Sequence, residues 1–253
     1  MKTGLTLEQL AAEITRQQSA KEDYVVNTGN LRLESYGPDL TLRVLDSDGA
    51  DRIEPLEIGD IAHRQIGTHL SIPAKYYERM RSEDPGLLAH NVNTWLERTP
   101  TQRMIRVLDG KARAYLSNRY LRMDNYSIAS AVLPILAEIP DVRIESCQIT
   151  DSRMYIKAVN PRLQEDVTPG DTVQAGVVIS NSEVGLGSVN IQPLIYRLVC
   201  SNGMVVNDAA TKRNHIGRAT DAEETFQLYS EKTLAADDHA FLLKVQDTVR
   251  AAA

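Results

Sequence analysis

Two short alternating runs around an Asp-Gly pair constrain the fold of this chain most strongly. Gln102–Leu108 and Ala112–Leu116 each have the alternation of a β-strand, and Asp109-Gly110 lies between them. Asp-Gly favours a type I′ turn, because both central residues of that turn need a positive φ, and this turn joins neighbouring antiparallel strands. The sequence therefore predicts a tight hairpin over residues 102–116.

The segments before this hairpin alternate between helical and strand patterns. Apolar residues at helical spacing predict one helix over Leu5–Ala20 and three short helices over residues 60–98. Between them, Tyr24–Ile58 has the short alternating runs of an antiparallel meander. The meander has too few strands to be stable alone, so we expect it to join the main sheet.

The segments after the hairpin predict one more helix, several strands and a final helix. The helix begins at Asp124 or Asn125 and ends before Pro140. The expected strands are residues 142–150, 154–159, 172–180 and 187–199, and helical spacing returns from residue 221. Because the last residues include no C-cap glycine, we expect a truncated final helix. The predicted fold class is α+β, with a largely antiparallel sheet and flanking helices.

The clearest boundary in the pattern is Thr99-Pro100, where helical periodicity changes to strand periodicity. We therefore predict an N-terminal part over residues 1–99, a main α+β domain over residues 100–220 and a C-terminal helix over residues 221–253.

Composition narrows the classes of protein. With 253 residues, 42% of them hydrophobic, the chain can bury a core. A net charge of -6 argues against a surface that is basic throughout. No apolar run reaches the roughly 20 residues of a membrane span, and no secretory signal is visible, so we expect a cytoplasmic protein. Cys147 and Cys200 form no CxxC pair, and no disulfide framework is predicted.

Against this acidic background, residues 98–122 hold seven cations and a single acid, Asp109. Tyrosines lie among the cations. Single-strand binding needs cations for phosphates and aromatic faces on which bases stack. The predicted phosphate contacts are Arg103, Arg106, Lys111, Arg113, Arg119 and Arg122, and the predicted stacking residues are Tyr115 and Tyr120. The alternative is a solvated ribbon whose arginines pair with acids elsewhere.

A second basic patch lies between Ala209 and Thr220, where no acid occurs. It contributes three further predicted nucleic-acid contacts, Lys212, Arg213 and Arg218, together with His215. A loop of this kind can close over a polymer. A surface loop without a ligand is an equally good interpretation.

Catalytic patterns are weak. His63 and His69 are six residues apart, whereas metal ligands on one helix face are four apart, and Gly185-Leu186-Gly187 lacks the third glycine of a dinucleotide loop. No metal or cofactor is predicted, and an enzyme is the minority interpretation. A hydrolase would use one of three candidate residues, Asn181, Ser182 and Cys200.

Several segments resemble a known family. They resemble the phage and plasmid-like proteins of domain-of-unknown-function family nine hundred and thirty-two. The segments are Ala112–Tyr120 with Asp124-Asn125, residues 179–185, and Tyr196–Met204. Residues 72–77 and 91–96 extend the resemblance to about residues 60–218. The family has no established activity, and the resemblance implies a genomic setting near replication and recombination genes. The element order is also similar to single-strand annealing proteins of the Rad-fifty-two and RecT type, which is an analogy of fold.

The leading hypothesis is a cytoplasmic, cofactor-free mobile-element protein that binds single-stranded DNA or RNA as a homo-oligomer, in recombination or annealing. The alternative is a protein-interaction or inhibitory module that acts on a host factor, because Arg and Tyr are also favoured interface anchors.

Four residues are predicted to be structural. Alternation places Arg197 on the same strand face as Ile195 and Val199, so its charge should be partly buried. We expect Asp124 to be its carboxylate partner. Asn202-Gly203 predicts a turn after this strand.

Overall fold

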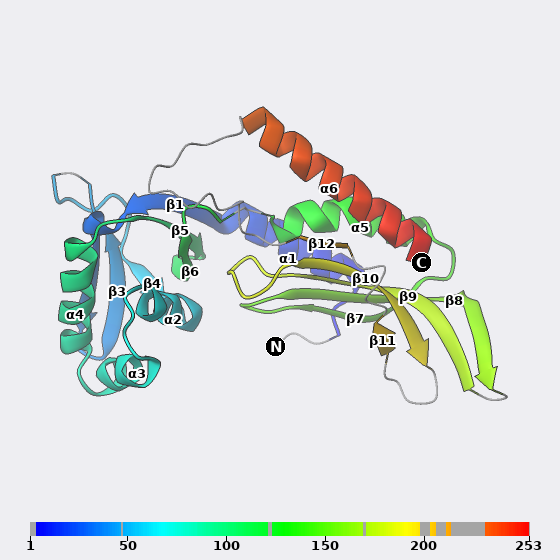
Figure 1. The fold of residues 1–253 in the computed structure, drawn as a ribbon, viewed down its shortest axis with the longest axis horizontal. Helices are drawn as coiled ribbons and strands as arrows, with labels where there is room; N and C mark the ends of the chain where they lie inside the picture. The colour runs from blue at the N-terminus through cyan, green and yellow to red at the C-terminus, as the bar shows by residue number, and fades with distance from the viewer. Residues whose placement is uncertain are drawn as a thin grey trace. The chain divides into compact units, whose positions relative to one another are not determined.

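The chain forms two compact units in a computed structural model that describes residues 4–46, 48–120, 123–168, 171–197, 203–205, 211–213 and 231–252 (Figure 1). Unit 1 comprises Met1–Arg16 and Leu121–Ala253, and unit 2 comprises Gln17–Tyr120. The division therefore falls after the predicted hairpin and not at Thr99-Pro100, because the hairpin pairs with strands that precede it in the chain.

Unit 2 is built on a six-stranded sheet of order β1-β5-β6-β4-β3-β2. Its strands are β1 (Lys21–Asn27), β2 (Leu31–Tyr36), β3 (Asp39–Val44), β4 (Leu56–Ile58), β5 (Gln102–Leu108) and β6 (Lys111–Ser117), and a 3-10 turn, η1 (Thr28–Asn30), joins β1 to β2. The β5–β6 hairpin is confirmed, and Asp109 and Gly110 have the positive φ values, 52° and 74°, that a type I′ turn needs. The predicted meander does join this sheet.

Three helices of unit 2 follow the predicted spacing: α2 (Asp60–His69), α3 (Ala74–Glu83) and α4 (Pro85–Arg98). The Asp84 carboxylate caps α4 by accepting a 3.0 Å hydrogen bond from the Leu87 amide, and Pro85 occupies the first helical position. α2 packs on β6 and α4 packs on β2, which encloses a core that includes Ile66, Leu88 and Val92.

Unit 1 is built on a second, antiparallel sheet of order β11-β10-β9-β8-β7, with β12 also paired to β10. Its strands are β7 (Arg143–Ile149), β8 (Met154–Thr168), β9 (Asp171–Asn181), β10 (Val189–Arg197), β11 (Gly203–Val205) and β12 (Thr211–Arg213). β11 pairs with residues 194–196 of β10 and β12 with residues 189–191, so Pro193, which has no amide donor, falls between the two short strands.

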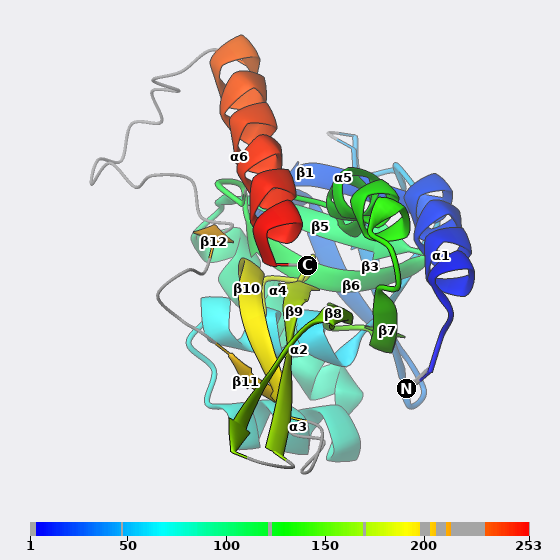
Figure 2. The same cartoon turned by 90° about the vertical axis from the view of Figure 1, so that its right-hand side faces the viewer.

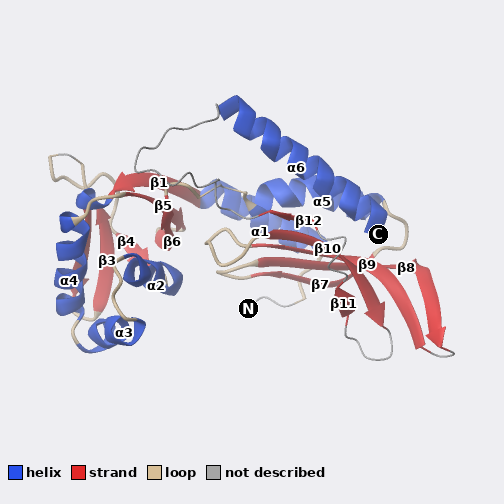
Figure 3. Ribbon diagram, in the orientation of Figure 1, coloured by secondary structure: helices blue, strands red, loops and turns tan. Residues whose placement is uncertain are grey.

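One face of this sheet is covered by three helices, α1 (Leu7–Ala20), of which Leu7–Arg16 belongs to unit 1, α5 (Asn125–Glu138) and α6 (Glu231–Ala252) (Figures 1 and 3). α5 and α6 pack side by side (Figure 2). Each helix packs apolar residues against strand residues such as Ile156. These helix residues include Leu10 and Ile14 of α1, Val132 of α5 and Val245 of α6. None of the described helices is long and apolar enough to cross a membrane.

The α+β prediction is confirmed, with two sheets in place of one main sheet. Among the described strand pairs, β4–β6 is the parallel one and the others are antiparallel.

Candidate nucleic-acid interface

Strand alternation divides the predicted basic ribbon between two faces. Arg106 lies on the opposite face of β5 from Arg103 and is fully buried, with 0% of its side chain exposed. Its guanidinium binds Asp23, which lies directly opposite on β1, through contacts of 2.9 Å (Nε to Oδ1) and 3.2 Å (Nη2 to Oδ2). Arg106 is therefore a structural residue in this fold, and the phosphate contact predicted for it has no exposed group to make it.

The two predicted stacking tyrosines are also buried. Tyr115 is 3% exposed, and its hydroxyl shares a 2.8 Å hydrogen bond with Nδ1 of His69 on α2. The Arg103 guanidinium lies 5.7 Å from the centre of the Tyr115 ring. Tyr120 is 8% exposed. Neither ring presents an open face of the kind on which a base stacks.

The remaining ribbon cations have different surroundings. Lys111 binds Glu57, its register partner on β4. Arg103 and Arg113 are half-buried and Arg119 is exposed, while Arg122 lies outside the described residues. A register shift at Arg106 and Val107 interrupts the alternation of the ribbon. The ribbon thus lacks the continuous row of cations that the sequence suggested.

The second basic patch is split as well, because Lys212 and Arg213 are neighbours on β12 and point to opposite faces. Arg213 points toward the helices, where Nη2 binds Asp237 (2.8 Å) and Asp238 (2.7 Å) of α6. Arg213 thus anchors α6. Lys212 is exposed on the other face, opposite Asn190 of β10. His215 and Arg218 lie outside the described residues.

Lys212 belongs to a surface that no sequence pattern predicted. We call the side of the unit 1 sheet that no described helix covers the helix-free face. Tyr155 and Lys157 of β8 and Tyr196 of β10 lie on it, and the Lys157 ammonium lies 4.4 Å from the centre of the Tyr196 ring. Its polar residues include Gln148, Gln174, Ser180, Asn190 and Gln192. By the same register, Asp166 of β8 also lies on this face, where its Oδ1 accepts a 2.5 Å hydrogen bond from the Thr172 hydroxyl of β9.

Glycine lets Lys157 and Tyr196 meet across the intervening strand. Gly176 of β9 lies between Val159 of β8 and Leu194 of β10, so no side chain of β9 separates the two at this level. Val159 and Leu194 are buried beneath them, in a small apolar cluster with Val178, Tyr155 and Tyr196. The Lys157–Tyr196 pair is therefore held by packing on an apolar base.

Two buried acceptors on the helix-free face have no hydrogen-bond donor within the part of the chain that the structure describes. They are Gln174 Oε1 and Asn190 Oδ1. A buried acceptor without a donor costs stability of about 1–3 kcal/mol. Because both atoms are buried, they are a cost to the stability of the sheet and not an open contact for a ligand.

The chain matches the family described as Domain of unknown function (DUF932) over residues 114–244, which is more than half of its 253 residues. It belongs to this family. No curated protein and no solved structure matches the chain, so the expected similarity to single-strand annealing folds gains no support. The DUF932 match begins within β6 and covers most of unit 1, including the helix-free face, whereas residues 72–77 and 91–96 lie outside it.

Two segments that carried the family resemblance meet in a buried polar cluster of the DUF932 domain. Asn181, which is fully buried at the end of β9, donates 2.9 Å hydrogen bonds from Nδ2 to the Met123 carbonyl and to Asn125 Oδ1. Glu183 Oε1 accepts a 2.6 Å hydrogen bond from the Asn125 amide. Together these bonds fasten the start of α5 to the end of β9.

This cluster bears on the structural and hydrolase predictions. Asp124 is half-buried at the N-cap of α5, while the Arg197 side chain and Asn202 lie outside the described residues, so their pairing stays a prediction. Gly203 begins β11 opposite Tyr196. Ser182 is fully buried and accepts a 3.1 Å hydrogen bond from the Leu186 amide. Asn181 and Ser182 thus have structural partners, and Cys200 is not described. Glu183 follows the Asn-Ser segment directly, but no sequence pattern marked it as a partner of Asn125.

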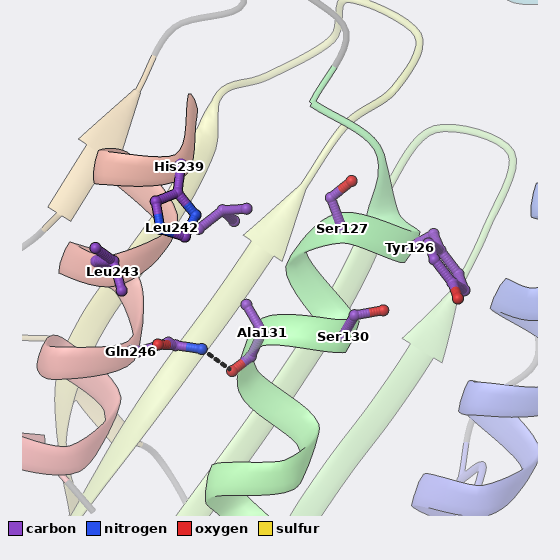
Figure 4. A pocket seen from close by; sticks show the side chains of 8 residues that line it. All are labelled: Tyr126, Ser127, Ser130, Ala131, His239, Leu242, Leu243 and Gln246. Carbon is purple, nitrogen blue, oxygen red and sulfur yellow. Dashed lines mark hydrogen bonds between the residues drawn. The ribbon is translucent and has the colours of Figure 1, made fainter. Parts of the chain in front are cut away.

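A pocket of about 330 Å³ lies between α5 and α6 in the DUF932 domain (Figure 4). Its lining residues are Tyr126, Ser127, Ser130, Ala131, His239, Leu242, Leu243 and Gln246. The Gln246 amide donates a 3.2 Å hydrogen bond to the Ala131 carbonyl across the floor. No carboxylate lines this pocket to orient His239 toward a serine, which a hydrolytic triad would need. Among the described residues, no group of three or more His, Cys, Asp or Glu could hold a metal ion.

The two histidines of α2 are held neutral by their surroundings. His63 is 2% exposed, and its Nδ1 shares a 2.9 Å hydrogen bond with the Tyr77 hydroxyl. Burial lowers the pKa of His63 to about 4. Burial, aided by the nearby Arg103 charge, also lowers the pKa of His69 to about 4. Protonation of either ring therefore opposes folding.

We expect the free energy of unfolding of unit 2 to decrease at acidic pH, because both histidine rings must stay neutral in the folded state. Their folded-state pKa lies below the ordinary value of 6.5, so the stability is complete above pH 6.5 and is lost as the pH falls toward 4. For His63 the loss at about pH 5 should be about 2 kcal/mol. Urea unfolding at neutral pH and at about pH 5 measures it. The double variant His63→Asn, His69→Gln should show a flatter pH profile, and an unchanged profile would contradict the assignment.

Proposed function

We propose that this DUF932 protein binds single-stranded nucleic acid on the helix-free face of unit 1. The observation that carries the proposal is the Lys157–Tyr196 pair with the half-buried Tyr155 beside it, on a sheet face with amide side chains. Proteins that bind single strands combine aromatic side chains for stacking with cations that follow the phosphates.

The two lysines of the face are suited to different phosphates. Lys157 is on β8 and Lys212 is on β12, with β9 and β10 between them. The Lys157 ammonium reaches Tyr196 of β10, whereas Lys212 lies opposite Asn190 of the same strand. Six residues of a strand span about 20 Å, which is too far for one phosphate to bind both ammonium groups. Tyr155, which is half-buried on β8, would stack a base, whereas Tyr196 is 8% exposed and supports the Lys157 ammonium.

Removing Lys157 and Lys212 together should weaken oligonucleotide binding in a salt-dependent way. Each lost phosphate contact should lower the log-log salt slope by about 0.7. Tyr155→Leu should weaken binding by about 1–3 kcal/mol through lost stacking. Fluorescence anisotropy of a labelled single-stranded oligonucleotide, measured from low to moderate salt, checks both expectations.

Lys244→Ala provides the matched control, because this exposed lysine lies on α6, on the helix side of unit 1. It should leave affinity and salt slope unchanged. Absence of binding at low salt, or equal affinity of the Lys157→Ala, Lys212→Ala variant and the parent, would contradict the proposal.

The wider setting of this activity is part of the same proposal. Single-strand binding is compatible with four further parts of the proposal. These are a phage or plasmid origin, a cytoplasmic location, assembly as a homo-oligomer, and a role in recombination or annealing. If the anisotropy titration finds no binding, the alternative is the protein-interaction module. The large apolar exposure of Leu163 (49%) and Val167 (60%) on β8 favours that alternative.

A further inference from the structure

We infer that unit 2 holds a second site for single-stranded nucleic acid, with Trp95 and Arg98 as a base-stacking platform and Arg103 as a phosphate contact. The inference rests on the proposed function, in that it assigns the same class of ligand. Its three binding residues lie outside both the helix-free face and the DUF932 match.

The platform is formed by the last turns of α4. Trp95 is the one tryptophan of the chain, and 43% of it is exposed. The Arg98 guanidinium, one turn further along the helix, lies 5.1 Å from the centre of the indole ring. An exposed indole beside a guanidinium offers two flat surfaces, on both of which a base can stack.

The charge of Arg98 is not neutralised by a neighbour in the described structure. The adjacent Glu97 binds Arg32, with Nη2 and Oε1 3.0 Å apart. Arg98 makes no ion pair among the described residues. Its contact with Trp95 does not neutralise it, because the indole ring carries no charge. The guanidinium thus keeps its positive charge at the surface, next to the indole.

Arg103 supplies a second cation close by. Arg103 follows Arg98 by five residues in the chain, so the Cα atoms of the two residues lie at most about 18 Å apart. The intervening residues 99–102 are exposed, and no acid occurs from Arg98 to Leu108. Both cations therefore lie within reach of a few successive nucleotides.

The guanidinium of Arg103 is positioned by packing and left without a carboxylate. It stacks over Tyr115, whose hydroxyl is fixed by His69, and His69 Nε2 is 3.4 Å from the Thr101 hydroxyl. Arg103 Nε is buried without a hydrogen bond, and Arg103 has no ion pair in the described part of the chain. Because Tyr115 holds the guanidinium in place, little side-chain entropy is lost when an anion binds.

A planar ligand with negative charge fits this arrangement. An acidic peptide would use the two cations but would leave the exposed indole without a partner. A single-stranded oligonucleotide uses all three groups, because bases stack on aromatic rings and phosphates bind arginine bidentately. The structure thus favours the nucleic acid, and the peptide becomes an outcome of the test.

The test uses the intrinsic fluorescence of Trp95, which reports on this site alone because the chain has one tryptophan. The full chain is titrated at low salt with an oligothymidylate of about six nucleotides, the size that one small binding site covers. We expect saturable quenching. Arg98→Ala and Arg103→Ala should each weaken the affinity reported by quenching about tenfold, while Arg79→Ala on α3, an exposed arginine of the same unit, should leave it unchanged.

Anisotropy in the same titration separates this inference from the proposed function. Quenching that persists in the Tyr155→Leu variant, whose helix-free face is impaired, supports the platform. Anisotropy without quenching overturns the platform and leaves the helix-free face standing. Quenching with no effect of the helix-free-face variants on anisotropy supports the platform and contradicts that face, and the absence of both signals overturns both. Quenching by polyglutamate but not by the oligothymidylate would also overturn the inference. Thermal unfolding of each variant confirms that it is folded.

Discussion

Arg106→Ala should lower the free energy of unfolding by about 3–5 kcal/mol, because it leaves the Asp23 carboxylate buried without its guanidinium. The Arg106 side chain is 0% exposed and that of Asp23 is 9% exposed, so water replaces little of the lost contact. The pair joins β1 to β5 directly across the sheet. Urea unfolding followed by circular dichroism gives the value.

Two further variants show whether the loss comes from the unpaired charge. Arg119→Ala removes an exposed arginine of the same ribbon and should change the free energy of unfolding by about 0.5 kcal/mol at most. Arg106→Met combined with Asp23→Leu replaces the pair with apolar side chains and should recover much of the stability. A loss below about 1 kcal/mol for Arg106→Ala would contradict the structural role assigned to this residue.

Gly176→Ala should also destabilise unit 1 strongly. A Cβ atom at this position would lie 2.3 Å from the Ala158 carbonyl oxygen and 3.1 Å from Val159 Cα, and both are backbone atoms that cannot turn aside. Overpacking of this kind costs about 1–3 kcal/mol and occasionally more. Because Gly176 lies under the Lys157–Tyr196 pair, the variant should weaken oligonucleotide binding as well.

Gly187→Ala is the matched control. There the new Cβ would meet Arg153 Nη2 at 2.7 Å, and this is the end of a flexible, exposed side chain. Gly187→Ala should therefore cost much less than Gly176→Ala. Thermal unfolding compares the two variants, and equal melting temperatures would show that the sheet can absorb the contact at Gly176.

Helices and strands were predicted well where a few neighbouring residues determine them. The β5–β6 hairpin follows from one Asp-Gly pair between alternating runs, and α4 follows from the helical spacing of its apolar residues. The division into units was not visible, because β5 and β6 pair with β1 and β4, whose positions in the sheet depend on contacts distant in sequence.

The candidate site was harder to predict, because neighbouring cations differ in what they face. Arg106 belongs to a buried pair whose acid lies more than eighty residues earlier. Lys212 and Arg213 are adjacent, yet one faces solvent and the other binds α6. Tyr155, Lys157 and Tyr196 come together only through the register of β8, β9 and β10. The sequence pattern predicts that a strand has two faces, but not which of them a helix covers.

The most direct test of single-strand binding by the helix-free face is photochemical crosslinking. A halogenated single-stranded oligonucleotide is bound to the full chain at low salt and irradiated, and the crosslinked peptides are identified by mass spectrometry. We predict a crosslink at Tyr155, which lies in a peptide from β8, and its loss in the Lys157→Ala, Lys212→Ala variant. Crosslinks confined to other segments, with none in β8 or β10, would contradict the central claim.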